Sequence, residues 1–282
     1  MDDKKKIKIL TSFVNEGKLM RKYKDITDVI EMADSLQGKN EFKEYIRNLA
    51  DGYVHMQDGI DPDSQMFVFR RALLVSVDDG EGYDQILEIY SKLWAAFLKR
   101  TDLSIEKYKL DYPDMSEIKP QYTLRHVALE MYSEIEMSVL QSPMLKVFCL
   151  NISDWIDKTD VDAFRAILAR TRNYMNNNFI VFRIPAVDEP TLQKVKESIS
   201  WFMNVDEVFC PPESQDDYFE YGIGCLKAKD IELDDGAKEI FRELIEQAKK
   251  KPDFWGYKTI ERITEDITIR ALWGSKGEML WS

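Results

Sequence analysis

The chain has 282 residues, of which 44% are hydrophobic and 32% charged, a composition that suits a soluble globular protein rather than a disordered or fibrous one. Asp and Glu number 51 against 39 Lys and Arg, so the formal net charge is −12. Binding to a phosphate backbone or an anionic membrane relies on a basic surface, and we therefore expect neither nucleic acid nor membrane as a partner.

The cysteines and the N-terminus indicate where the protein works. Cys149, Cys210 and Cys225 form no CxxC pair and have no histidine beside them, which argues against a zinc site and a disulfide framework. The N-terminal residues are charged and lack the apolar segment of a secretory signal. The most apolar stretch, 66–77, contains two arginines and is too short to span a bilayer. We expect a cytoplasmic protein with reduced thiols and no bound metal.

The first fifty residues predict helices. Apolar residues recur at helical spacing from Ile7, from Ile26 and from Phe42, with a break at Gly38-Lys39-Asn40. This part carries no catalytic signature, and we interpret it as a helical packing or adaptor element. A segment rich in turn formers, 56–64, follows it.

Short apolar runs then alternate with helical patterns. The expected strands are 66–69, 72–77, 105–110, 144–150, 179–184 and 205–210, and the expected helices between them are 86–97, 122–140, 161–175 and 190–202. Apolar runs without alternation suit strands that are buried on both faces, so this order predicts a parallel α/β sheet with right-handed crossovers. From residue 214 onward only helices are expected, over 216–228, 234–248 and 259–272.

This layout resembles that of an AAA+ ATPase module, with a glycine turn, Asp78-Asp79-Gly80-Glu81-Gly82, after an early strand and a helical lid behind the sheet. The stretch from FIVFRIPAVDEPTLQKVKESI to the end of ERITEDI resembles the last strands and the lid of the rubisco-activase-like and stage V sporulation AAA proteins. In that group a Phe-Gly-Asn-type turn precedes the last lid helix, and Phe254-Trp255-Gly256-Tyr257 occupies the matching place.

The resemblance covers roughly residues 52–275 and implies a division of the chain. It implies a helical N-terminal segment over 1–51, a P-loop NTPase-like (AAA+) parallel sheet with helices on both faces over 52–212, and a C-terminal helical lid over 213–282.

The phosphate-binding motif that this resemblance implies is altered. A P-loop reads GxxxxGK[ST]: backbone N–H groups and the lysine hold phosphates, and the hydroxyl holds Mg²⁺. The matching window keeps Gly80 and Gly82. It has Val77 for the first glycine, Tyr83 for the lysine and Asp84 for the hydroxyl. Two like charges ~4 Å apart repel by about 1 kcal/mol even in water, so the acidic loop is expected to reject the ATP phosphates unless metal ions intervene. The carboxylates concerned are Asp78, Asp79, Glu81 and Asp84.

The other nucleotide motifs that the resemblance implies are altered too. At the Walker B position the family has Asp and Glu after an apolar strand, whereas this chain has Asn151 and Ile152. Asn151 could accept a hydrogen bond from a metal-bound water, but Ile152 can neither orient nor deprotonate water. Asp154 lies two residues further on. An arginine of the family's lid often reaches the phosphates, and Lys258 or Arg262 falls at that place.

Other signals have a structural and a functional interpretation. The four loop carboxylates are either a solvated helix N-terminus or a Mg²⁺ or Ca²⁺ site. Three arginines after the Walker B-like strand either end a helix or complete the site of a neighbouring subunit: Arg165, Arg170 and Arg172. His55 and His126, the only histidines, support no hydrolytic triad. The run 249–251 is interpreted as a helix C-terminus. Large aromatic residues suggest core or interface anchors, and an exposed subset would indicate a protein partner: Trp201, Phe202, Trp255, Tyr257, Trp273 and Trp281.

Together these features predict a non-hydrolysing AAA+-like pseudo-ATPase that acts as a protein-interaction or assembly subunit, beside an active AAA+ relative or another copy of itself. No cofactor and no catalytic residue are expected. One alternative is a divergent ATPase that binds Mg·ATP with metal around Asp84, Asn151 and Asp154. Another is a module that holds a different small ligand in the former nucleotide cleft. A cleft filled by Tyr83 would favour the first interpretation, and an open acidic cleft would favour the last.

Overall fold

The computed structural model describes residues 24–56, 71–117, 119–141, 145–175 and 178–274. Its centre is one five-stranded sheet in the order β2-β3-β4-β1-β5, and all four neighbouring pairs are parallel. The expected parallel α/β sheet is confirmed, while the strand expected at 66–69 lies outside the described residues. The strands are β1 (Ala72–Ser76), β2 (Ser104–Lys109), β3 (Lys146–Asn151), β4 (Asn178–Ile184) and β5 (Val205–Phe209).

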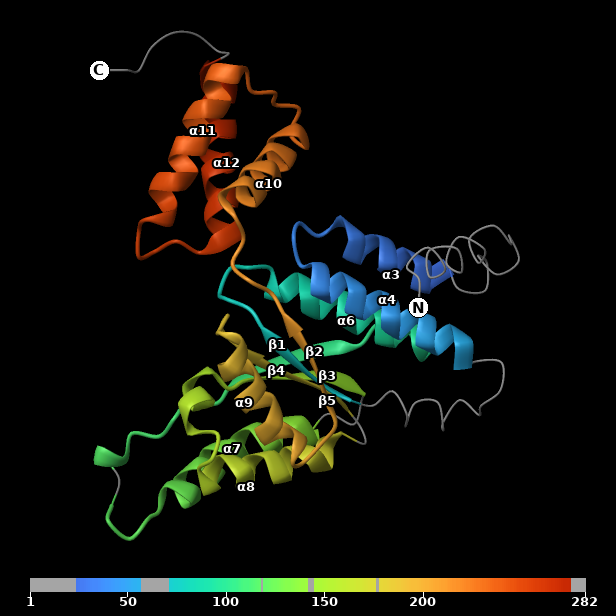
Figure 1. The fold of residues 1–282 in the computed structure, drawn as a ribbon, viewed down its shortest axis with the longest axis vertical. Coiled ribbons are helices and arrows are strands. Elements are labelled where there is room, and N and C mark those ends of the chain that lie inside the picture. The colour runs from blue at the N-terminus through green and yellow to red at the C-terminus, as the bar shows by residue number, and fades with distance from the viewer. Residues whose placement is uncertain (1–23, 57–70, 118, 142–144, 176–177, 275–282) are drawn as a thin grey trace.

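Helices cover both faces of this sheet (Figure 1). On one face α6 (Tyr83–Phe97) packs with the N-terminal helices, and on the other α7 (Leu124–Gln141), α8 (Asp162–Thr171) and α9 (Glu189–Ser200) form a second layer. Successive residues of β1 serve opposite cores: Leu73 belongs to the first and Leu74 to the second. All five residues of β1 are buried, as expected from the apolar run that makes up its first four positions.

The N-terminal helices α3 (Lys24–Ser35) and α4 (Asn40–Met56) share the first core with α6 and the sheet. The Tyr53 ring of α4 stacks on Phe97 of α6 with centroids 4.0 Å apart, and its hydroxyl donates a hydrogen bond to the Phe97 carbonyl over 2.7 Å. Trp94 of α6 stacks in turn on Phe179 of β4, 4.2 Å away. These helices therefore pack as part of the sheet layer. The helical pattern expected before residue 24 lies outside the described residues.

Three helices form the lid: α10 (Gln215–Lys227), α11 (Asp235–Lys249) and α12 (Gly256–Gly274). Side chains cap the first turns of two of these helices. Ser214 and Asp217 make a reciprocal capping box at the start of α10, and Asp234 accepts a hydrogen bond from the Ala237 N–H at the start of α11. The lid has a core of its own, built from Tyr218, Phe219, Phe241, Ile245, Tyr257 and Ile260. In Figure 1 the lid lies beyond the ends of the strands, and one connecting segment joins it to β5.

Three short 3₁₀ helices complete the described elements: Met115–Glu117, Ser153–Lys158 and Arg172–Tyr174. The helix expected over 161–175 is thus α8 followed by a 3₁₀ turn. Cys149 and Cys210 are buried, Cys225 is half-buried, and all three are free thiols. Within the described part of the chain, no helix has both the length and the apolar character that crossing a membrane requires.

Candidate functional site

The loop between β1 and α6 lies where the first strand ends, beside β4 and beneath the lid. Gly80 and Gly82 have φ angles of 84° and 80°, in the left-handed region that favours glycine. Gly82 is the residue that precedes α6, and no side chain caps that helix. The two glycines give the loop the sharp turn that the sequence predicted. The partners of this loop decide what it can bind.

Arg183, near the end of β4, holds the start of the loop. Its Nε and a terminal nitrogen both donate to the Val77 carbonyl, over 3.2 and 3.0 Å, and the guanidinium pairs with Asp79 at 2.9 Å. Asp78 accepts a hydrogen bond from the Ala186 N–H over 2.9 Å. Arg183 is only 5% exposed, so its charge is used inside the protein. The cation that comes nearest to the start of the loop is therefore engaged by the loop itself.

The lid covers the middle of the loop. The Tyr257 N–H, at the start of α12, donates to the Gly80 carbonyl over 3.1 Å. A side chain at Gly80 would overlap the Trp255 carbonyl, and one at Gly256 would overlap the Glu81 carboxylate. Gly256 has a φ of 46°, so both sides of this contact use left-handed glycines to bring two backbones together. The aromatic turn of the lid therefore sits directly on the glycine loop.

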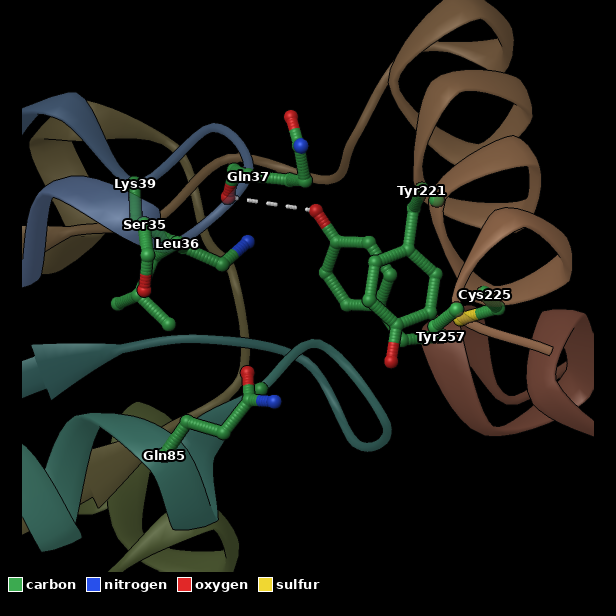
Figure 2. Close-up of a pocket in the computed structure, with 11 residues that line it drawn as sticks. Ser35, Leu36, Gln37, Lys39, Gln85, Tyr221, Cys225 and Tyr257 are labelled. Carbon is green, nitrogen blue, oxygen red and sulfur yellow. Dashed lines mark hydrogen bonds between the residues drawn. The ribbon is translucent and has the colours of Figure 1, made fainter. Parts of the chain in front are cut away.

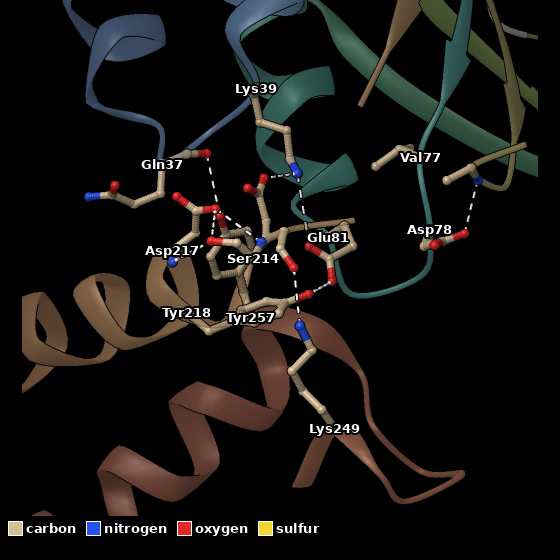
Figure 3. A network of polar contacts seen from close by, with 12 residues as sticks. Gln37, Lys39, Val77, Asp78, Glu81, Ser214, Asp217, Tyr218, Lys249 and Tyr257 are labelled. Atoms are coloured by element: carbon tan, nitrogen blue, oxygen red, sulfur yellow. Dashed lines mark hydrogen bonds and ion pairs between the residues drawn. The ribbon is translucent and has the colours of Figure 1, made fainter. Parts of the chain in front are cut away.

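A buried ionic network joins the loop, the N-terminal helices and the lid (Figure 3). Lys39, between α3 and α4, pairs with Glu213 in the chain that leads to α10, and its nitrogen lies 3.9 Å from Glu81. Glu81 also accepts a hydrogen bond from the Tyr218 hydroxyl of α10. The Lys249 nitrogen, at the end of α11, donates to the Glu213 carbonyl over 3.3 Å. Four segments far apart in sequence are thereby tied together at one point.

The charges of this network do not balance. One ammonium, that of Lys39, serves two carboxylates, and all three side chains are at most 7% exposed. One oxygen of Glu81 is buried without a hydrogen-bond partner among the described residues. Burial raises the pKa of Glu81 above its ordinary value of 4.5, although Tyr218 and Lys39 act in the opposite direction. The neighbouring carboxylates of Glu213 and Asp78 raise the pKa of Glu81 further.

Tyr83, which the sequence resemblance matches to the P-loop lysine, packs inward. Its buried hydroxyl lies near the Cys149 thiol of β3, and the Arg183 guanidinium stands 5.8 Å from the centre of its ring. Burial, with a smaller contribution from Cys149, raises the pKa of Tyr83 well above its ordinary value of 10.0. Asp84, at the hydroxyl position, is exposed and pairs with Lys107 of β2 at 2.7 Å. The Tyr83 hydroxyl is thus inside the protein, and the Asp84 carboxylate makes an exposed ion pair.

The residues that the sequence resemblance matches to the Walker B motif have structural partners. Asn151 accepts a hydrogen bond from the Ser153 N–H, at the start of the 3₁₀ turn that follows, over 3.0 Å. Ile152 is buried in the second core. Asp154 pairs with Lys109 of β2 at 3.2 Å. Asp84 and Asp154 are thus each held by a different lysine of β2, and in the described part of the chain no three acidic, histidine or cysteine side chains gather into a metal site.

The remaining candidates are spread over the surface. Lys258 is exposed beside the Trp255 ring, and Arg262 lines a hollow between α11 and α12. Arg170 pairs with Glu136 of α7 at 3.0 Å. The His126 ring bonds Thr123 locally, and the His55 side chain lies outside the described part. Trp201 and Trp255 are exposed, Phe202 is half-buried and Tyr257 is buried, whereas the side chains of Trp273 and Trp281 are not described.

A cavity of about 310 Å³ opens beside the loop, between the core and the lid (Figure 2). Leu36 and Gln37 after α3, Gln85 of α6 and Tyr221 of α10 line it, together with Tyr257. The Tyr257 hydroxyl donates to the Gln37 carbonyl over 3.4 Å. This volume is at the lower end of the range for small-molecule sites. The covered loop and the open cavity are neighbours, since Gly82 belongs to both.

A strand, a glycine turn and a helix that starts from it form the local unit of P-loop proteins, and here the strand lies inside a parallel sheet. The fold is of the α/β, P-loop NTPase-like class. No protein-family model and no curated protein matches the sequence.

Solved structures with similar folds have low sequence identity. The replication initiator DnaA, bound to AMPPCP and single-stranded DNA, is 12% identical over 86% of this chain, with a TM-score of 0.44. The PCH-2 protein of C. elegans is 10% identical over 84% of this chain and 69% of its own, with a TM-score of 0.40. The ORC1 protein of Aeropyrum pernix, in complex with DNA, is 13% identical over 79%, with a TM-score of 0.34. The chain spans just under two thirds of the DnaA and ORC1 chains, 66% and 64%.

The expectation that nucleic acid is no partner is wrong. Two of these structures, DnaA and ORC1, are complexes with DNA. The physical reason is that a net charge of −12 describes the whole chain, whereas contact with a phosphate backbone depends on the local surface that meets it. The overall charge therefore does not exclude this class of partner.

Sequence reasoning located the loop but missed most of its partners. Lys39 falls in a predicted helix break, and Glu213 falls between a strand and a helix, where a charge carries no pattern. Their positions are 174 residues apart, and only the folded chain joins them. Arg183 had a detectable signal, because it is a charge inside the otherwise apolar run of β4.

Proposed function

We propose that this chain is a non-hydrolysing AAA+-like module that serves as a protein-interaction or assembly subunit. The observation that carries the proposal is the occupation of the glycine loop by the protein itself. The Val77 carbonyl is bonded to Arg183, the Gly80 carbonyl to the Tyr257 N–H, and Glu81 to Tyr218 and Lys39. Contacts with β4 and the lid thus stand where a nucleotide would otherwise bridge the core and the lid.

The chemistry of the residues supports this proposal. Phosphoryl transfer needs cations and N–H groups around the phosphates, a metal held by hydroxyl or carboxylate oxygens, and a group that orients water. Here the nearby cations Lys39 and Arg183 are paired with carboxylates, and Tyr83 is packed against β3. The residues present do not fit Mg·ATP, and we derive no reaction step from it. The divergent ATPase is the weaker alternative, because Asp84 and Asp154 each pair with a lysine.

A second candidate function is the binding of a small ligand in the cavity beside the loop. The cavity is favoured because it remains open while the loop is covered, and because tyrosine rings and the Gln85 amide line it. Lys39, the cation that lines it, is already paired with Glu213. The ligand is therefore neutral or cationic rather than a polyphosphate.

Calorimetric titration separates these functions. The proposal expects no heat from Mg·ATP or Mg·ADP near millimolar concentration, either with the native chain or with Tyr83→Phe, which keeps the ring. Micromolar binding of Mg·ATP would overturn it, and a turnover assay would then decide whether hydrolysis follows. Adenosine is the probe for the second candidate, since it has an aromatic base and no phosphate. Its binding should be lost in Gly224→Phe, because Gly224 lines the cavity and has open space around it.

A further inference from the structure

A groove between α8 and α9 lies on the face of the sheet that the N-terminal helices do not cover. It encloses about 220 Å³ and is lined by Thr159, Asp160, Arg165, Lys194, Trp201 and Phe202, among others. Trp201 is 85% exposed, the largest exposure of any large hydrophobic side chain in the described part of the chain. Nothing described in the structure covers this ring.

The backbone that carries the exposed ring is fixed by hydrogen bonds. Trp201 ends α9, and its N–H donates to the Glu197 carbonyl over 3.3 Å. The next two residues, Phe202 and Met203, bond back to Ile199 and turn into the core. A tryptophan buries about 150–250 Å² on contact and loses little conformational freedom when its backbone is already fixed. Tryptophans of this kind are enriched at the centres of protein interfaces.

Two cations beside Trp201 have no carboxylate partner among the described residues. Neighbouring positive side chains on the same helices are paired: Arg170 of α8 with Glu136, and Lys196 of α9 with Glu207. Arg165 and Lys194 make no such pair, although the chain carries 51 acidic residues. One carboxylate, that of Asp160, lines the groove with them. The groove is thus a locally cationic spot on an acidic protein.

The same groove also contains a buried hydroxyl group that lacks a hydrogen-bond partner among the described residues. Thr159 is 1% exposed and lines the groove, and its Oγ1 has no hydrogen-bond partner among the described residues. Buried hydroxyls in folded proteins nearly always have a partner, and one left without costs about 1–3 kcal/mol. An acceptor brought into the groove would supply the missing partner after a small local adjustment.

We propose that this groove binds an acidic segment of a partner protein. An apolar side chain of the segment packs on Trp201, and its carboxylates pair with Arg165 and Lys194. This gives Arg165 a role on the surface of its own subunit. The inference rests on the interaction role proposed above, but it is independent of nucleotide binding. A failed peptide experiment would therefore leave the calorimetric result with Mg·ATP unchanged.

The test selects random short displayed peptides on the immobilised full-length chain and measures the best of them, labelled with fluorescein, by polarisation. The selected peptides should combine Asp or Glu with Leu, Ile or Phe, and binding should weaken as salt is added. Trp201→Ala and Arg165→Glu should each weaken binding at least about tenfold. Trp255→Ala in the lid and Arg172→Glu at the end of α8 are matched controls and should bind as the native chain does.

Three results would overturn the proposal: no selected peptide, selected peptides without acidic residues, or equal binding to Trp201→Ala. Because Trp201 is exposed, this variant should keep the native unfolding temperature, so lost binding is not a folding defect. Sedimentation of the native chain gives a separate check. If it associates with itself and Trp201→Ala does not, the occupant is a second copy, and the partner-segment proposal is wrong.

Discussion

Among the described residues, Lys39 carries the one ammonium that pairs with Glu81 and Glu213 in the lid contact, and replacing it with methionine removes that ammonium. The Lys39 side chain is 2% exposed, and those of Glu81 and Glu213 are 5% and 7% exposed. Removing one partner of such a buried pair costs about 3–5 kcal/mol, because the remaining charge is left without compensation. Methionine keeps a β-carbon and a similar length at a residue whose φ is 52°, so the backbone strain is the same in both chains.

The loss should appear first at the boundary between the core and the lid. The Tyr257 amide is a direct reporter, because it donates to the Gly80 carbonyl across this boundary. A loss of about 3 kcal/mol corresponds to more than a hundredfold faster exchange of this amide with deuterium. Amides inside β4, which bond to both neighbouring strands, should exchange at the native rate.

Matched variants make the result interpretable. Lys92→Met removes an exposed pair with Glu88, whose side chains are 41% and 55% exposed, and should cost less than about 1 kcal/mol. Adding Glu213→Gln to Lys39→Met removes one of the uncompensated charges and should restore part of the protection. If exchange at Tyr257 accelerates less than about threefold in Lys39→Met, the ionic network does not hold the lid, and the reasoning is refuted.

Three further predictions concern the same contact. Burial raises the pKa of Glu81 above 4.5, so the stability that this group contributes is complete at low pH and is lost as the pH rises through the raised pKa. Unfolding temperatures measured between about pH 4 and pH 8 should show this decline. The variant Glu81→Gln should remove it. Gly80→Ala should lower the free energy of unfolding in urea by at least about 2 kcal/mol, because the residue has a left-handed backbone and abuts the lid. Gly224→Ala, inside a helix with open space around it, should raise the free energy of unfolding by about 0.5–1 kcal/mol. Equal effects of the two variants would contradict the close contact. Arg183→Met removes two hydrogen bonds to a loop carbonyl and should cost about 2–3 kcal/mol; a change below about 0.5 kcal/mol would show that the clamp is unimportant.

The fold could be predicted because its signals are local. Strands that are buried on both faces are mostly apolar along their length, and β1, β3 and β4 are therefore mostly apolar runs in the sequence. Boundaries were less accurate: α6 begins at Tyr83 rather than 86, and α12 at Gly256 rather than 259, since the first turn of each helix carries few apolar residues of the periodic face.

The site could be predicted only in part because its partners are distant in sequence. The glycines marked the loop, because left-handed backbone leaves a residue-type signature. The pairing of Lys39 with Glu213 leaves none, since a lysine in a helix break and a glutamate in a linker are each common on solvated surfaces. The two side chains hold the lid only because both are buried where the lid meets the core, and their burial depends on the whole fold.

The side chains at the positions that the resemblance matches to nucleotide motifs share one property, because each has a partner or a packed neighbour within the chain. Val77 is fully buried in the first core and Ile152 in the second, so each adds apolar contact where the motif has a glycine or a carboxylate. Asp84 and Asn151 satisfy partners within their own segments or on β2. In a nucleotide-binding protein these positions must stay unsatisfied until phosphate and metal arrive, which costs stability in the empty state. Here the side chains at these positions have partners or apolar contacts within the chain itself.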